Sequence, residues 1–170
     1  MRRSLPQPTP AQARESLNAH VVARGAELRQ KYGPQIGIAE LHRILADRDF
    51  VRYPCEIAFD AAPLEPGELA YPNPKGERPE DGFVLCLHPD LAAHPFGVPF
   101  IALYQLVAVN YGAFAAPDDA EAFGAAALGL DKEDYYRALC ELADALGGGE
   151  PSDEDCGSGC GGGCSCGSHS

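Results

Sequence analysis

The chain has 170 residues and a formal net charge of −12 at pH 7, from 13 Lys and Arg against 25 Asp and Glu. A surface with this excess of carboxylates repels phosphate backbones, so we expect no nucleic-acid partner. The first residues lack the apolar segment of a secretory signal peptide, and the seven cysteines are an odd number. We therefore expect a soluble cytoplasmic protein whose cysteines are reduced.

The ordered part of the chain is predicted to be a single domain over residues 9–147, after a disordered leader at residues 1–8. Thr9, Pro10 and Gln12 form a capping-box pattern that predicts the start of a helix. Gly33 and Pro34 predict its end. A second, shorter helix is predicted from about residue 38 to residue 47, where apolar side chains recur at helical spacing.

The pattern beyond Phe50 changes from helical to alternating. It predicts strands at residues 53–60 and 83–88, with a short strand possible at residues 68–71. The run FVLCLH at 83–88 is nearly all apolar, which is typical of a central strand. Because the connections are too short for crossover helices, we predict a small, mainly antiparallel three-stranded sheet, and an α+β fold class.

The segment from Leu91 to Pro117 contains no Asp, Glu, Lys or Arg. Its apolar residues from about 99 to 116 lie on every side at helical spacing, so we predict one fully buried central helix there. Internal polar residues and prolines argue against a membrane span. Gln105 and Asn110 lie roughly 140° apart around the helix axis and are predicted to bond neighbouring backbone on two different sides.

Two more helices are predicted before the C-terminal segment. Asp118 is a suitable N-cap for a helix that should stop at Gly129. Asp131 then caps a helix with one apolar stripe, which Gly147 and the two glycines after it should end. We expect the ordered domain to end there as well.

A weak candidate site in the predicted domain consists of His88, Asp90 and His94, at the junction between a strand and the central helix. These are residue types that bind metals, but their spacing matches no common ligand pattern. The order of helix, strands and helix has the layout of a zinc-peptidase-like domain, although no HExxH motif is present. A catalytic site near these histidines is therefore one alternative for the function.

The C-terminal segment, residues 148–170, is predicted to be flexible because it lacks aliphatic and aromatic side chains and is rich in Gly and Ser. It also concentrates five soft metal ligands within fourteen residues: Cys156, Cys160, Cys164, Cys166 and His169. Thiolate-rich sets of this kind select zinc, copper(I) or iron. The sequence thus favours a metal-handling or protein-interaction module that binds a soft metal ion through this segment and docks a protein partner, without a nucleic acid or membrane partner.

Another interpretation of the same segment is a ribosomal peptide precursor. In that case the Cys, Ser and Gly residues after Gly147 and Gly148 would be the substrate of a modifying enzyme. A third possibility is a solubilising tail in which the cysteines have no role. These alternatives differ in what a measurement of mass or metal content would find.

Overall fold

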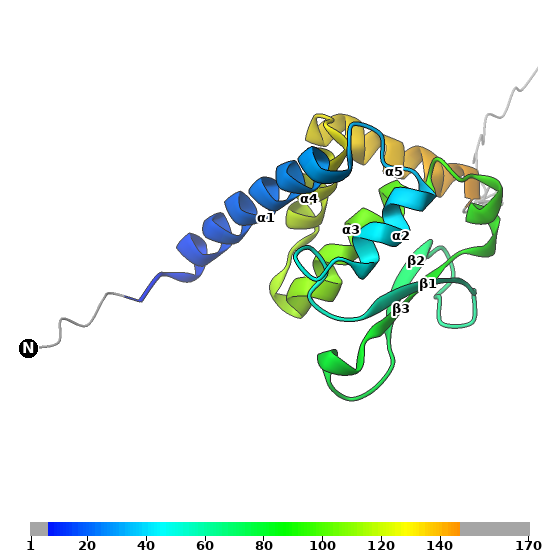
Figure 1. Cartoon of the computed structure of the whole chain (residues 1–170), viewed down its shortest axis with the longest axis horizontal. Coiled ribbons are helices and arrows are strands. Elements are labelled where there is room, and N and C mark those ends of the chain that lie inside the picture. The colour runs from blue at the N-terminus through cyan, green and yellow to red at the C-terminus, as the bar shows by residue number, and fades with distance from the viewer. Residues whose placement is uncertain (1–6, 147–170) are drawn as a thin grey trace, which may run out of the picture.

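The computed structural model describes residues 7–146, which form five α-helices and a three-stranded sheet (Figure 1). The elements in chain order are α1 (Pro10–Tyr32), α2 (Ile38–Ala46), β1 (Cys55–Phe59), β2 (Ala70–Pro74), β3 (Phe83–Leu87), α3 (Val98–Tyr111), α4 (Pro117–Leu128) and α5 (Lys132–Leu146). The α+β class predicted from the sequence is confirmed. The predictions of a disordered leader at residues 1–8 and a flexible segment at 148–170 fall almost entirely outside the described residues.

The sheet is mixed, so the prediction of a mainly antiparallel sheet is wrong. Its strand order is β1-β3-β2, in which β1 pairs with β3 in parallel and β2 pairs with β3 antiparallel. The chain reverses direction twice between β1 and β3, and β2 lies within that connection. Because β2 itself serves as part of the crossover, a parallel pair forms without a helix between its strands.

Strand composition explains why β3 takes the central position. Leu85, Cys86 and Leu87 in β3 are buried, as expected for a strand with neighbours on both sides. Strand β2 instead contains Pro72 and Pro74, which lack a backbone N–H and are tolerated at a sheet edge. The sequence pattern placed this strand too early, because the prolines after Tyr71 suggested a loop.

Helix α3 lies at the centre of the fold, in contact with α2, α4, α5, β2 and β3. Eight of its fourteen residues are buried and the other six are half-buried, so it is enclosed on most sides rather than completely. The helix ends at Tyr111, before the predicted end at residue 116. Gly112 has a φ of 59°, a left-handed conformation that favours glycine, and a short 3-10 turn follows.

Helix caps follow the sequence closely, with one difference. Thr9 and Gln12 form the predicted capping box of α1, and Gly129 ends α4 in the left-handed conformation. Helix α4 begins at Pro117, however, and its cap is made by Asp119 rather than Asp118. The Asp119 carboxylate accepts a hydrogen bond from the Ala116 N–H at 2.9 Å and is almost completely buried.

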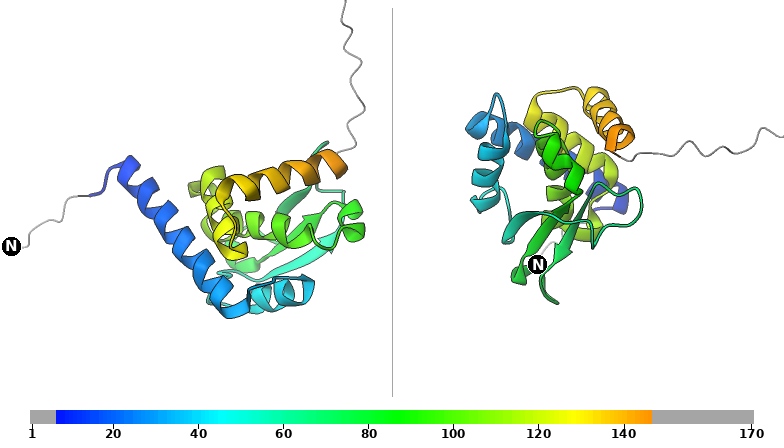
Figure 2. Two further views of the ribbon diagram at one scale, coloured as in Figure 1. Left: turned by 90° about the horizontal axis from the view of Figure 1, so that it is seen from above. Right: turned by 90° about the vertical axis from the view of Figure 1, so that its right-hand side faces the viewer.

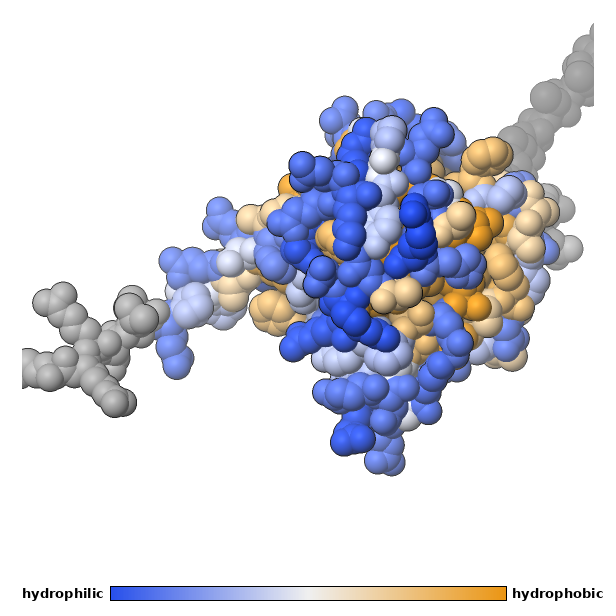
Figure 3. Space-filling view, in the orientation of Figure 1, coloured by the Kyte–Doolittle hydropathy of each residue, from blue (hydrophilic) through white to orange (hydrophobic). Residues whose placement is uncertain are grey.

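Helices α1 and α5 complete the helical part of the fold. Helix α1 lies against α4 and extends beyond the body at its N-terminal end, while α5 crosses the side of α3 opposite the sheet (Figures 1 and 2). Gly25 permits the close approach of α1 and α4, because a Cβ there would lie 2.6 Å from the Phe123 carbonyl oxygen. Figure 3 shows mainly hydrophilic residues over α1 and more apolar residues toward the right-hand side of the same face.

No helix in residues 7–146 is long and apolar enough to span a membrane.

Candidate functional site

The predicted metal ligands Cys156, Cys160, Cys164, Cys166 and His169 lie outside the described residues. The metal site proposed for the C-terminal segment therefore stays a prediction from the sequence. Helix α5 ends at Leu146, whose buried side chain lies beside the loop before β2.

The structure brings together two of the three residues of the weak candidate site. The Asp90 N–H donates to His88 Nδ1 at 3.3 Å, and an Asp90 carboxylate oxygen lies 3.7 Å from the same nitrogen. His94 caps the end of the short 3-10 turn that follows, and its backbone N–H bonds Leu91. Among residues 7–146, no three His, Cys, Asp or Glu side chains gather closely enough to hold a metal ion.

The three cysteines in the described residues are also separate from one another. Cys55 and Cys86 are on strands of the sheet, and Cys140 is on α5. Burial raises the pKa of the Cys55 thiol to about 11 and also raises that of Cys86. Both thiols thus stay protonated at neutral pH, which makes them poor metal ligands.

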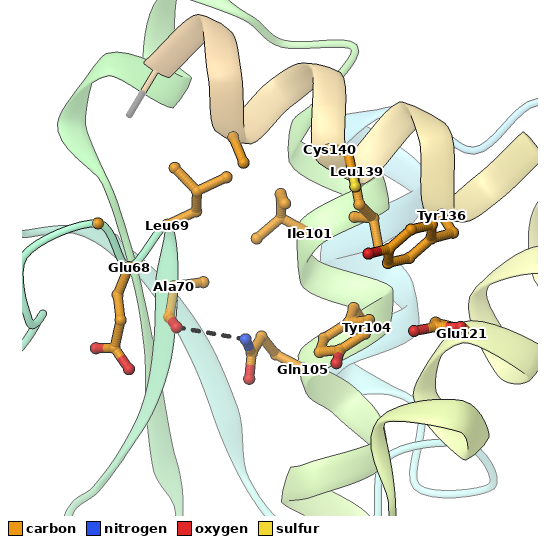
Figure 4. Close-up of a pocket in the computed structure, with 12 residues that line it drawn as sticks. Glu68, Leu69, Ala70, Ile101, Tyr104, Gln105, Glu121, Tyr136, Leu139 and Cys140 are labelled. Carbon is orange, nitrogen blue, oxygen red and sulfur yellow. Dashed lines mark hydrogen bonds between the residues drawn. The ribbon is translucent and has the colours of Figure 1, made fainter. Parts of the chain in front are cut away.

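A pocket of about 420 Å³ lies between α3, α5 and the segment leading into β2 (Figure 4). Its walls are mainly apolar and contain a few polar groups, a composition typical of small-molecule and peptide sites. The lining residues are Gly67, Glu68, Leu69, Ala70, Ile101, Tyr104, Gln105, Glu121, Tyr136, Leu139, Cys140 and Ala143. We call this the α3–α5 pocket.

Gln105 joins the two sides of this pocket. Its Nε2 donates to the Ala70 carbonyl oxygen at 3.3 Å, which ties α3 to the edge strand β2 (Figure 4). This confirms the prediction that Gln105 bonds neighbouring backbone. The amide oxygen of Gln105 is left to accept a hydrogen bond from a bound group.

Tyr104 and Glu121 form the polar wall of the α3–α5 pocket. Burial raises the pKa of the Tyr104 hydroxyl, and the negative charge of Glu121 raises it further. The neutral phenol can donate or accept, while the Glu121 carboxylate can only accept. This wall therefore suits a ligand group that carries a donor or a positive charge.

Tyr136 and Cys140 lie on consecutive turns of α5 at the mouth of the pocket (Figure 4). The neighbouring Cys140 side chain raises the pKa of the Tyr136 hydroxyl. No pattern in the sequence indicates that a pocket lies there. Tyr136 is 53% exposed, so it can contact a bound ligand without being part of the core.

Comparisons with protein-family models, curated proteins and solved structures found no match for this chain.

Sequence reasoning missed the α3–α5 pocket because its residues come from four separate segments. Only Gln105 gave a signal, as a polar residue within an apolar helix. Glu121 and Tyr136 lie on different helices, α4 and α5, and meet only because both helices pack against α3. Their spacing along the chain carries no pattern that predicts this.

Proposed function

We propose that the protein binds a soft metal ion, zinc, copper(I) or iron, through its C-terminal segment. The observation that carries the proposal is the run of Cys156, Cys160, Cys164, Cys166 and His169 within fourteen residues. Four of these five groups would complete a tetrahedral site, and the Gly and Ser residues between them allow the backbone to turn around an ion.

The chemistry of the other cysteines supports this assignment. Partial burial of Cys55 and full burial of Cys86 raise the pKa values of their thiols, so they compete poorly for an ion at neutral pH. The cysteines of the C-terminal segment have no large apolar residues near them in sequence. Their pKa values should therefore stay near the ordinary value of about 8.5, or fall when a metal binds.

The folded part would then dock a protein partner that delivers or receives the metal. The α3–α5 pocket combines apolar walls with the carboxylates of Glu68 and Glu121. The whole chain carries a net charge of −12. Both features favour a partner segment with an apolar side chain beside a Lys or Arg.

Metal titration of the full-length protein tests the first part of this proposal. Under reducing conditions we expect stoichiometric binding of Zn²⁺ or Cu⁺ that disappears when Cys156, Cys160, Cys164 and Cys166 are all replaced by Ser. Cys140→Ser is the matched control, since it removes a thiol from α5 and should leave binding unchanged. Binding by wild type no stronger than by the four-Ser variant would refute the proposal.

Thermal unfolding in the same titration tests where the metal acts. The ligands follow the last helix of the folded part in sequence, so we expect metal to bind with little change in the unfolding midpoint. Affinity should fall as the pH drops below about 8, because the thiols must lose protons to bind. Intact mass of protein from its native host would instead reveal modified Cys or Ser if the segment is a peptide substrate.

A further inference from the structure

A second pocket, of about 340 Å³, lies at the C-terminal end of α3 and does not include Gln105. It is formed by α1, by the connection between α2 and β1, and by the C-terminal end of α3. We call it the arginine pocket, because Arg24, Arg48 and Arg52 line it together with His20 and Asp49. None of these residues is a predicted ligand of the C-terminal metal site.

The charge of this pocket is opposite to that of the protein. Three arginines and Asp49 give the lining a net charge of +2, and the Glu27 carboxylate that pairs with Arg24 reduces this to +1, while the whole chain has a charge of −12. Only 13 Lys and Arg are present in the chain, so three of them at one pocket is a strong local concentration. Such a concentration attracts anions even when the remaining surface repels them.

The arginines differ in how they are held. Arg24 pairs with Glu27 and donates to the Asp49 carbonyl oxygen, so its guanidinium is fixed in place. Arg48 and Arg52 make no ion pair within residues 7–146, and both side chains are exposed. Their donors are therefore available to a ligand that enters from solvent.

Asn110 fixes the backbone that carries these groups. Its Nδ2 donates to the Phe50 carbonyl oxygen at 2.8 Å, and its Oδ1 accepts from the Arg52 N–H at 2.8 Å. The two bonds attach the segment after α2 to the end of the central helix. A binding segment held in this way loses less conformational entropy when it binds a ligand.

Aromatic side chains form the rest of the lining. The Arg24 guanidinium lies 4.7 Å from the centre of the Phe50 ring, and the His20 and Tyr111 rings meet edge to face at 6.0 Å. Tyr111 is half-buried. Burial raises the pKa of the Tyr111 hydroxyl, and the positive charges of Arg24 and Arg52 oppose this rise. The pocket thus places a phenol and aromatic rings beside guanidinium groups.

We propose that the arginine pocket binds a small phosphorylated organic compound. A phosphate monoester carries a charge of about −1.5 to −2 at pH 7, which the net positive charge of the pocket attracts, and the unpaired guanidinium groups of Arg48 and Arg52 can bind its oxygens in pairs. The volume of about 340 Å³ leaves room for an organic part beside the aromatic rings. A nucleic-acid strand is disfavoured because it would need an extended basic surface on a chain with a charge of −12.

The test uses phenyl phosphate as the probe, with inorganic phosphate and benzoate for comparison, each titrated calorimetrically into the full-length protein at low ionic strength. We expect phenyl phosphate to bind more tightly than either of the others. The variant Arg48→Gln/Arg52→Gln should weaken its binding by about tenfold or more, because it removes two charge-assisted donors. Both side chains are exposed, so the variant should keep the wild-type unfolding midpoint.

The matched control is Arg14→Gln/Arg137→Gln, which changes the net charge by the same amount at exposed positions on α1 and α5. It should bind phenyl phosphate as wild type does. Equal weakening in both double variants would mean that overall charge alone is responsible, and would overturn the proposal. The proposal would also be overturned if wild type did not bind phenyl phosphate, or bound inorganic phosphate with the same affinity. Benzoate binding as tightly as phenyl phosphate would show that the pocket does not select a phosphate group.

Discussion

The hydroxyl of Tyr135 donates to the Phe100 carbonyl oxygen at 2.6 Å, and the two rings stack with their centres 5.7 Å apart. Tyr135 is the first large side chain of the apolar stripe on α5 and is completely buried. Gly124 on α4 lies against the same ring, where no Cβ would fit. This one side chain therefore joins α3, α4 and α5.

We expect Tyr135→Phe to lower the free energy of unfolding by about 1 kcal/mol, because it removes one hydrogen bond and keeps the ring. Tyr135→Ala should lower it by about 3–5 kcal/mol through loss of the buried ring. Urea unfolding measures both values. The control is Tyr136→Phe, at an exposed neighbouring position, where a loss as large as that of Tyr135→Phe would contradict this account.

Gly25→Ala should destabilise the protein although alanine favours helices. The new Cβ would lie 2.6 Å from the Phe123 carbonyl oxygen and 2.8 Å from the Ala126 Cβ, so α1 and α4 would have to separate. We expect a loss of about 1–3 kcal/mol in the free energy of unfolding. Ser16→Ala on the exposed side of α1 should be neutral or slightly stabilising, and a stabilising Gly25→Ala would show that the helices are not in close contact.

Asn110→Ala should cost more stability than Gln105→Ala. Asn110 makes two bonds to backbone at 2.8 Å, whereas Gln105 makes one at 3.3 Å. We expect losses in the free energy of unfolding of about 2 kcal/mol for Asn110→Ala and about 1 kcal/mol or less for Gln105→Ala. Chemical denaturation of the two variants side by side measures the difference, and the reverse order would contradict the hydrogen-bond geometry.

Asp47 should make the stability depend on pH in the acid range. A hydrogen bond from Lys31, then one from Tyr32, lowers the pKa of its carboxyl to about 2. A lowered pKa stabilises the folded state above the unfolded value of about 3.8, and this contribution is lost as the pH falls toward 2. Roughly half of it should be lost by pH 3.

The measurement compares wild type with Asp47→Asn in urea unfolding at pH 6, 4 and 3. We expect wild type to be more stable by about 1–2 kcal/mol at pH 6, with a smaller difference at pH 3. Asp144→Asn, at an exposed position on α5, is the control and should give no such trend. A difference that stays constant from pH 6 to pH 3 would mean that the Asp47 carboxyl is not held by Lys31 and Tyr32.

The sequence determined the helices well because their signals are local. The capping box at Thr9 and Gln12 and the stop at Gly129 each depend on residues within one helical turn. The two amides of the central helix were also predicted correctly, because a buried polar group in an apolar helix must find a partner. Because an α-helix has 3.6 residues per turn, Gln105 and Asn110 lie on different sides of α3, and they line two different pockets.

Tertiary structure decided the sheet order and both pockets. Strand pairing depends on which strand buries the most apolar surface. In this sheet β3 is the most buried strand and lies between β1 and β2, so the strands do not pair in the order of the sequence. The three arginines of the arginine pocket come from α1 and from the connection after α2, so they meet only when α1 packs beside the end of α3. The C-terminal cysteines are the converse case, because they lie outside the described residues and their function is proposed from sequence spacing alone.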